Sequence, residues 1–503
     1  MLIAGVNTSH HGSVCLLKDG ELVFYIEEER LSRKKYDDEI IFGVKKIKEY
    51  SDCIDYVVVC NTRQHEHEMK LLKSVFPTSK IIDYRKIHHL CHASLGFYNS
   101  SFDEALCFVL DGSGSRYNGK KELESVYFAQ NPNKFVPVFK HYNGADYKSD
   151  KVNFYSNGLS VGGLFEGTCL AFGFHPLDGG KVMGLSSFGK SNTQIPEIFV
   201  NGNAEAPFFF GNNTGYFYGI PKEDIAYEVQ TQTENHVIEM IKKYSSEYNC
   251  KNIILTGGYA LNCVANYKYL DLGLNIYVEP ISHDGGTAIG AAKYFWYKLS
   301  KSQKRYSHDT LYYGFDYEVP NENNTSYDEI VSLLIDEHPV CIFQGKSEAG
   351  PRALGNRSIL YNPTVKDGKN ILNKMKHREN FRPFAAVVLE EFVHEWFNMK
   401  GLNSSPFMMY AVQCKDKYKH KIPAVLQVDG TSRVQTVTEK TNAALYKLIK
   451  MFYNETGIPM LLNTSFNLAG EPLVETPADA IHTMKNSEFN YLYFPETHTL
   501  RRY

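Results

Sequence analysis

The 503-residue chain is predicted to fold as an α/β protein with more than one domain. Segments rich in β-branched residues alternate with helical patterns over much of residues 1–295, which favours helices layered on sheets. The length is about three times that of a usual single domain, so two large domains or three ordinary ones are expected. Hydrophobic residues at 43% and aromatic residues at 14% are sufficient for sizeable cores.

The first half of the chain begins with short strands that give way to alternating elements. We expect strands at 2–6, 13–17 and 21–26, a helix near 40–50, strands near 55–60 and 80–84, a helix near 88–98 and a strand at 105–110. The Asp19-Gly20 turn is typical of a tight hairpin between the second and third strands. Residues 112–240 show weak periodicity, and we expect loops and helices there without a separate fold.

Regular order returns near residue 252. We expect a strand at 252–256, a helix that follows Gly258 and runs through Asn266, a strand at 274–278, a helix at 286–292 and a strand at 339–344. The polar stretches 298–305 and 319–326 form the best candidate linker. The sequence therefore predicts one domain over residues 1–318 and a second over residues 327–503.

Charge and cysteine usage exclude several classes of protein. With 54 Lys and Arg against 57 Asp and Glu, the chain has no overall attraction to nucleic acid or anionic lipid, and we expect neither as a direct partner. The ten cysteines are scattered and never form Cys-x-x-Cys, as expected for reduced thiols. Without a leader pattern or a long apolar run, a cytoplasmic protein is expected. The sequence leaves the oligomeric state open, and a homodimer is one option.

A first candidate site contains paired histidines. In His88-His-Leu-Cys-His92, a helix would place His88 and His92 on one face, where two imidazoles reach one metal ion. Asp111 and Asp284 each follow a predicted strand and precede glycine, so both are expected at the carboxyl edge of a sheet. Such a set suits a divalent transition ion but does not separate iron from zinc or manganese. The alternative is that the histidines pack or cap a helix and the aspartates cap turns.

Two glycine loops form a second candidate site. The first contains Gly112, Ser113 and Gly114, and the second contains Gly257, Gly258 and Asn262. Glycine lets backbone N–H groups approach phosphate oxygens, and a following helix N-terminus favours negative charge. Either loop alone is weak evidence for a nucleotide site, because any strand-to-helix turn can use glycine. Together they suggest a nucleotide cleft between two related lobes.

A third candidate site is a basic cluster. Six cationic residues are interleaved with glycine, proline and phenylalanine: Lys346, Arg352, Arg357, Lys376, Arg378 and Arg382. A solvated basic helix would instead place alanine, glutamate and leucine between its charges. This pattern favours guanidinium groups aimed at a phosphate-bearing ligand, with surface salt bridges as the alternative.

Distinctive motifs lie along nearly the whole chain. They are Asn7-Thr-Ser-His10, Glu27-Glu-Glu-Arg30-Leu-Ser-Arg33, His88-His-Leu-Cys-His92, Lys181-Val-Met-Gly-Leu185, Gly350-Pro-Arg-Ala-Leu-Gly-Asn-Arg-Ser358, Val428-Asp-Gly-Thr-Ser-Arg-Val-Gln-Thr436 and Leu462-Asn-Thr-Ser-Phe-Asn467. Together these motifs resemble those of the NodU/CmcH family of O-carbamoyltransferases. The resemblance implies a two-lobed, TsaD-like first domain of the actin and sugar-kinase (ASKHA) type and an α/β, YrdC-like second domain. It also implies that carbamoyl phosphate and ATP form carbamoyl adenylate, whose carbamoyl group passes to a hydroxyl of an acceptor.

The resemblance also assigns roles to residues. His10 would be the general base, and iron(II) or another divalent metal would be bound by His88, His92, Asp111 and Asp284. The adenylate would be held by Gly112, Ser113, Gly114, Gly257, Gly258 and Asn262. Carbamoyl phosphate and ATP with magnesium would be bound by Arg352, Asn356, Arg357, Lys376, Arg378 and Arg433, with Arg352 and Lys376 also catalytic. His11, Lys346 and Gln427 stand where the family commonly has Asp, Arg and His.

The expected acceptor is a small molecule, either a sugar or another natural product. One alternative is a macromolecular acceptor, such as a hydroxymethylated nucleotide or DNA base or a surface glycan. The other is a non-catalytic protein that senses nucleotides and keeps the ASKHA cleft without turnover.

Overall fold

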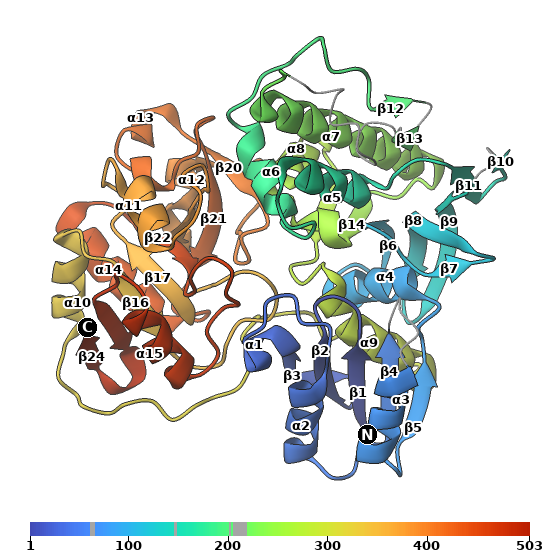
Figure 1. The fold of residues 1–503 in the computed structure, drawn as a ribbon, viewed down its shortest axis with the longest axis horizontal. Coiled ribbons are helices and arrows are strands. Elements are labelled where there is room, and N and C mark those ends of the chain that lie inside the picture. Colours follow the sequence, from blue (N-terminus) through green and yellow to red (C-terminus); the bar gives the residue numbers. More distant parts are fainter. Residues whose placement is uncertain (61–65, 145–147, 201–202, 205–218) are drawn as a thin grey trace. The chain divides into compact units, whose positions relative to one another are not determined.

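The computed structural model describes residues 1–60, 66–144, 148–200, 203–204 and 219–503. The chain forms two compact units, of which the first comprises residues 1–28 and 36–309 and the second comprises residues 29–35 and 310–503. Figure 1 shows both as mixtures of helices and sheets. The division falls at 309/310, earlier than the expected 318–327, and the second unit includes a short segment from the beginning of the chain.

The first unit contains a five-stranded sheet in the order β3-β2-β1-β4-β5. Its strands are β1 (Leu2–Asn7), β2 (Ser13–Lys18), β3 (Glu21–Glu27), β4 (Tyr56–Cys60) and β5 (Lys80–Asp83). Strands β1, β2 and β3 form an antiparallel meander, whereas β4 is parallel to β1 and β5 is parallel to β4. Helices α2 (Ile41–Tyr50) and α3 (Glu66–Val75) belong to the same lobe.

A second, larger sheet repeats this topology around β6. Its strands are β6 (Glu104–Leu110), β7 (Arg116–Tyr117), β8 (Lys120–Gln130), β9 (Lys134–Asn143), β10 (Lys148–Ser149), β11 (Asn153–Ser156), β14 (Asn252–Thr256) and β15 (Asn275–Val278). The central order β9-β8-β6-β14-β15 has antiparallel strands on one side of β6 and parallel strands on the other, as around β1. The duplicated sheet confirms the two-lobed α/β architecture expected for the first domain.

The prediction of loops and helices over 112–240 was wrong for the strands β8 and β9. Both are long and pair along most of their length, with β8 bound to β6 on its other side. The alternation of β8 is obscured because Glu122 and Glu124 are buried there. Lys140 forms an ion pair with Glu122, and His141 Nδ1 lies 2.6 Å from Glu124 Oε2. Buried ion pairs therefore replace the apolar residues by which a strand is usually recognised.

Two helices pack against each other and join the two sheets. Helix α4 (His88–Asn99) packs on β6 and β14, and α9 (Thr287–Ser300) packs on β1, β2 and β4. A side chain at Gly290 would overlap the carbonyl of Cys91, so this glycine permits the close approach. The contact brings the first turn of α4 close to the start of α9.

A buried polar chain also links these helices. Asn99 on α4 donates to Glu279 Oε2 at 2.9 Å and accepts from Lys293 Nζ on α9 at 2.5 Å. Burial raises the pKa of Glu279 to about 7 and lowers that of Lys293 to about 8. Desolvation therefore outweighs the attraction between these two opposite charges.

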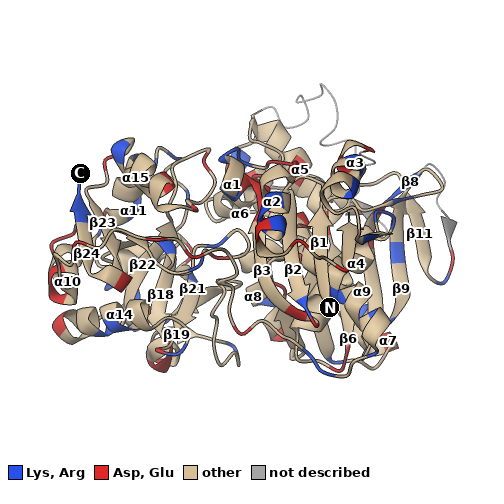
Figure 2. Cartoon of the chain, turned by 90° about the horizontal axis from the view of Figure 1, so that it is seen from below, with Lys and Arg blue, Asp and Glu red and all other residues tan. Residues whose placement is uncertain are grey.

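Further elements complete the first unit. They are α5 (Val161–Phe172), α6 (Gly179–Ser186), β12 (Phe199–Val200), β13 (Asn203–Ala204), α7 (Lys222–Glu247) and α8 (Cys263–Tyr269). Helix α7 packs on the second sheet through Tyr244, whose ring meets those of Phe108 and Phe139. Basic and acidic residues are both distributed over the helices and strands of each unit (Figure 2). Among the described residues, no helix combines the length and apolar character needed to cross a bilayer.

The second unit is built on a mixed sheet in the order β19-β20-β21-β18-β22-β17-β16-β23-β24. The strands are β16 (Val340–Phe343), β17 (Arg357–Tyr361), β18 (Ala385–Leu389), β19 (Phe397–Asn398), β20 (Ala411–Cys414), β21 (Thr431–Val437), β22 (Met460–Ser465), β23 (Tyr491–Phe494) and β24 (Thr499–Arg502). The helices are α10 (Tyr327–Ile335), α11 (Gly368–Met375), α12 (Val393–Trp396), α13 (Asp416–Lys419), α14 (Ala443–Thr456) and α15 (Pro477–Lys485). The unit is α/β as expected, and its likeness to YrdC stays a prediction.

Residues 29–35, which include most of α1 (Glu28–Ser32), are held in the second unit by arginines. Arg30 donates to the carbonyl of Gly350 at 2.7 Å. Arg33 donates to the carbonyls of Pro472 and Leu473 at 3.0 and 2.6 Å. These charged hydrogen bonds explain why the segment belongs with residues that follow it by more than 300 positions.

Candidate functional site

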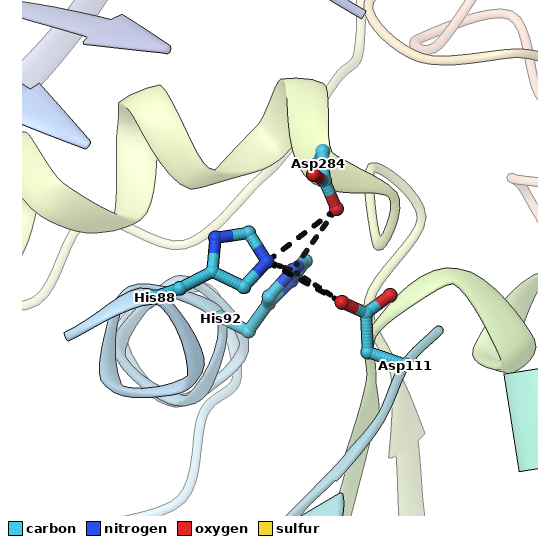
Figure 3. Close-up of side chains that lie close together, drawn as sticks. All are labelled: His88, His92, Asp111 and Asp284. Carbon is cyan, nitrogen blue, oxygen red and sulfur yellow. Dashed lines mark hydrogen bonds and ion pairs between the residues drawn. The ribbon is translucent and has the colours of Figure 1, made fainter. Parts of the chain in front are cut away.

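Four predicted metal ligands meet in the first unit. His88 and His92 lie on the first two turns of α4, Asp111 directly follows β6, and Asp284 begins the short helix η5 (Asp284–Gly286) that leads into α9. One ligand atom from each lies within 4.8 Å of the others, and Figure 3 shows the side chains pointing toward one another. His88 Nε2 lies 3.3 Å from Asp111 Oδ2 and 3.5 Å from Asp284 Oδ1. The i, i+4 spacing therefore places both imidazoles toward the two carboxylates.

The cluster is buried and carries opposed charges. Both histidines are fully buried, and the two aspartates are almost so. Burial alone would lower the pKa of His88, but Asp284 and Asp111 raise it well above its ordinary value. His88 Nε2 and His92 Nε2 lie only 3.1 Å apart, so the pair needs a proton or a cation between its lone pairs. Two nitrogens and two carboxylate oxygens fit a divalent transition ion.

Neighbouring loops fix the two carboxylates. Asp111 Oδ1 accepts the N–H of Gly258 at 3.1 Å, so the two glycine loops meet at this residue. Gly257 has a φ of 89°, and a side chain there would overlap the backbone of Leu110. Asp284 Oδ2 accepts the hydroxyl of Ser9 at 2.7 Å. The chain segments after β1, β6 and β14 therefore converge on one site, as their sequence positions predict.

His10 faces a cavity next to this cluster. Its Nδ1 lies 3.6 Å from Asp284 Oδ2, and its side chain is 37% exposed. The cavity has a volume of about 410 Å³ and also receives Asp111, Gly112 and Ser113. It therefore joins the predicted base, one predicted metal ligand and part of the first glycine loop.

The adjacent His11 has a different environment. It has a φ of 63°, and its ring stacks on that of His283 with centroids 4.7 Å apart. Burial, together with His283 and His10, lowers the pKa of His11 to about 3 and keeps it neutral. Of the two adjacent histidines, only His10 lines the cavity.

Sequence reasoning missed the six other residues that line the cavity. They are Tyr36, Asp38, Glu166, His175, Pro176 and Leu177. Burial and the negative charges of Asp111 and Asp284 raise the pKa of Glu166 to about 7. The signal that could have found Glu166 is its isolation, because it is the sole charged residue in the otherwise uncharged helix α5.

The remaining members of the glycine loops have structural roles. The carbonyl of Gly112 accepts the Ser160 hydroxyl, and the N–H of Gly114 bonds to the carbonyl of Glu122. Asn262 caps α8 by accepting the N–H of Ala265 and exchanges two hydrogen bonds with Gln230. Its amide group is therefore engaged within the fold, and its contact with adenylate stays a prediction.

In the second unit, Glu348 organises the Gly350–Ser358 loop, which carries Arg352 and Arg357 of the basic cluster. Its Oε1 accepts the N–H groups of Leu354 and Asn356 at 2.7 and 2.9 Å. The side chain of Asn356 donates to the carbonyl of Lys346 and accepts from Asn442. A buried carboxylate thus fixes the turns of the Gly350–Ser358 segment.

Two of the expected phosphate ligands are engaged inside this unit. Arg357 is fully buried, donates to the carbonyls of Gln344 and Glu475, and stacks on the ring of Phe343. Lys376 is 1% exposed and donates to the carbonyls of Ser465 and Asn467. The structure thus favours roles in holding the fold for both residues, because their donors already meet backbone oxygens.

The guanidinium groups of Arg378, Arg382 and Arg433 lie near one another. Burial lowers the pKa of Arg378 well below its ordinary value, and the nearby charges of Arg382 and Arg433 lower it further. Arg378 stacks on Phe384 and donates to Asn373 Oδ1 at 2.6 Å. Arg352 is half-buried on the glycine- and proline-containing loop. Cations that repel one another in this way would be stabilised by a bound anion.

Comparison with known proteins places the whole chain in one family. Residues 68–293 match the carbamoyltransferase N-terminus and residues 331–501 match the carbamoyltransferase C-terminus. The nodulation protein NolNO of Sinorhizobium fredii is 30% identical over 96% of this chain and 78% of its own. An uncharacterized protein of Methanocaldococcus jannaschii is also 30% identical, over 98% of both chains.

A solved structure of full-length HypF in a phosphate- and nucleotide-bound form covers 60% of this chain and 56% of its own. Its TM-score of 0.42 and identity of 15% are too low to carry an argument about function. The matches to both family regions and the relatives aligned along nearly the whole length agree with the NodU/CmcH-type motifs. The chain belongs to the carbamoyltransferase family.

Proposed function

We propose that the protein is an ATP-dependent O-carbamoyltransferase that forms carbamoyl adenylate and transfers its carbamoyl group to a hydroxyl of a small-molecule acceptor. The proposal rests on the buried His88, His92, Asp111 and Asp284 cluster, which adjoins a cavity that also receives His10. A proton acceptor and a cation site beside one cavity suit the transfer step. The unpaired cysteines and the need for ATP favour a cytoplasmic location.

The chemistry requires both activation and proton removal. A carbamoyl carbonyl is a poor electrophile because its nitrogen donates electrons into it, and adenylation supplies a good leaving group. The acceptor oxygen bonds to the carbonyl carbon, the bond to AMP breaks, and the hydroxyl proton passes to His10. A histidine that takes such a proton contributes on the order of 10²–10⁴-fold.

The four clustered residues would hold a divalent ion, which supplies Lewis acidity toward a carbonyl or phosphate oxygen when bound. Two imidazoles and two carboxylates fit iron(II) as well as other transition ions, and the family resemblance favours iron. Asp111 and Asp284 are held by Gly258 and Ser9, so the ligands are positioned before an ion binds.

We assign adenylate formation to the second unit. Arg352, Arg378 and Arg433 would bind carbamoyl phosphate and ATP with magnesium, since guanidinium forks match phosphate oxygens. Asn356 and Arg357 would hold the loop that carries Arg352, and Lys376 would hold the segment that leads to Arg378. This division corresponds to the two-domain reaction that the family resemblance implies.

The test uses carbamoyl phosphate labelled in its carbamoyl carbon, together with ATP, magnesium and iron(II). We expect AMP to form only when carbamoyl phosphate is present, and label to appear on an alcohol when an extract supplies the acceptor. Mass spectrometry would identify the product by the mass of one added carbamoyl group. Absence of both AMP and carbamoyl adenylate would contradict the proposal, and ATP binding without turnover would favour a nucleotide sensor.

A further inference from the structure

The cavity beside His10 has one aromatic and apolar wall. The rings of Tyr36 and His175 stack at 4.7 Å with an interplanar angle of 16°, and Pro176 and Leu177 continue this side. The hydroxyl of Tyr36 donates to Asp178 Oδ1 at 2.6 Å, which fixes the ring. A rigid ring pair beside apolar side chains suits the flat face of a cyclic organic ligand.

The polar residues of the cavity are mainly acidic. Asp38, Asp111 and Glu166 all line it, and its described lining includes neither lysine nor arginine. Asp111 faces the cation site, so Asp38 and Glu166 form the acidic side of the cavity. A phosphate or carboxylate of the acceptor would be costly to place beside them, because like charges in a half-buried site repel strongly. An anionic acceptor is therefore disfavoured, whereas hydroxyl and ammonium groups find hydrogen-bond acceptors.

Asp38 and Glu166 are the two carboxylates in this lining that the proposed reaction does not yet use. Asp38 already interacts with other residues, whereas Glu166 has no hydrogen-bond or ion-pair partner among the described residues. Its carboxylate lies over Gly112, where any side chain would overlap it. Helix α5 holds it rigidly, because Ser160 caps the helix and Gly162 packs against the backbone of Asp111 and Gly112. A carboxylate so placed, with its oxygens uncommitted, can accept hydrogen bonds from a ligand.

We propose that Glu166 selects the acceptor by accepting a hydrogen bond from its hydroxyl or ammonium group, so that the cavity takes uncharged or amine-bearing polyols and rejects anionic acceptors. The inference rests on the proposed transfer function and names the residue and charge class that determine specificity there. Glu166 acts in binding and orientation, and His10 remains the group that takes the proton.

The experiment compares defined probes as acceptors: methyl glucoside, methyl glucosaminide and glucose 6-phosphate. Wild-type protein is first assayed for AMP formation dependent on carbamoyl phosphate, and then for carbamoyl transfer to each probe. We expect transfer to the first two and at least tenfold lower kcat/KM for the phosphate. In Glu166→Gln, kcat/KM for the glucosaminide falls about 10- to 100-fold, mainly through KM, because a charged hydrogen bond is lost. For the neutral glucoside the loss is only about two- to tenfold.

Glu239→Gln is the matched control, since Glu239 is exposed on α7 outside the cavity. It should leave every rate unchanged, and thermal unfolding of both variants checks that each is folded. The inference is overturned if glucose 6-phosphate is the better acceptor, if Glu166→Gln changes no acceptor's kcat/KM, or if neither uncharged nor amine-bearing probes react while AMP forms. Failure of wild-type AMP formation would instead contradict the proposed function.

Discussion

Replacement of His10 by asparagine should separate the two half-reactions. The variant keeps a polar side chain beside Asp284 but removes the imidazole that would take the acceptor's proton. A general base contributes on the order of 10²–10⁴-fold, which corresponds to about 3–5 kcal/mol of activation free energy. His10 is 37% exposed and lines a cavity, so the free energy of unfolding should change by no more than about 0.5 kcal/mol.

Each half-reaction has its own assay for this variant. AMP formation from ATP and carbamoyl phosphate should match the wild type, whereas single-turnover transfer to the acceptor should fall by two to four orders of magnitude. His11→Asn is the control, because asparagine tolerates the positive φ at this position and the His11 ring stacks away on His283. Transfer by His10→Asn within about threefold of the wild type, or equal loss of both activities, would refute the assignment of His10 as the base.

Three further predictions address other parts of the molecule. Asp111→Asn should lower the affinity for the metal ion because it removes an anionic oxygen that faces His88. The loss should exceed the 10- to 100-fold that is typical when a residue outside the ligand set is changed, as measured by elemental analysis after dialysis. An unchanged metal content would contradict the cluster as the metal site. Arg352→Ala should abolish AMP formation that depends on carbamoyl phosphate. The control Arg501→Ala breaks a surface ion pair and should retain this activity. Equal AMP formation by the two variants would show that the basic cluster is a surface feature. Burial raises the pKa of Glu279 from 4.5 to about 7, so the folded state binds a proton that the unfolded state releases and wild-type stability falls as pH rises through this range. The free energy of unfolding of Glu279→Gln should therefore rise by about 3 kcal/mol relative to that of the wild type as the pH is raised from 4.5 to 8, as denaturant titrations would measure. If the difference between the two free energies does not change with pH, Glu279 stays ionised in the folded state.

The parts of the structure that follow from local spacing could be predicted from the sequence. His88 and His92 share a helix face because they are four residues apart, and Asp111 lies at a sheet edge because it follows an apolar strand. The role of Arg357 depends instead on distant partners, since the carbonyl of Glu475 that it meets lies 118 positions away. The sequence shows that Arg357 is cationic and lies near a glycine, but it does not show which oxygen atoms surround the guanidinium group in the fold.

Glu166 shows the second limit. It lies in the region whose strands were missed because buried charges interrupt the apolar alternation. Without β8 and β9, the sequence gives no indication that α5 packs beside Asp111 and Gly112. The cavity wall is therefore a product of tertiary structure, whereas the cluster of His88, His92, Asp111 and Asp284 arises largely from helix and strand periodicity.

The position of residues 29–35 has a consequence for biosynthesis. Arg30 and Arg33 emerge from the ribosome long before Gly350, Pro472 and Leu473, whose carbonyls they bind. These guanidinium groups stay without their final acceptors until residues 320 to 440 positions later have been made. A fragment that starts at residue 310 would lack both donors, so its folding should improve when a synthetic peptide spanning 29–35 is added in trans.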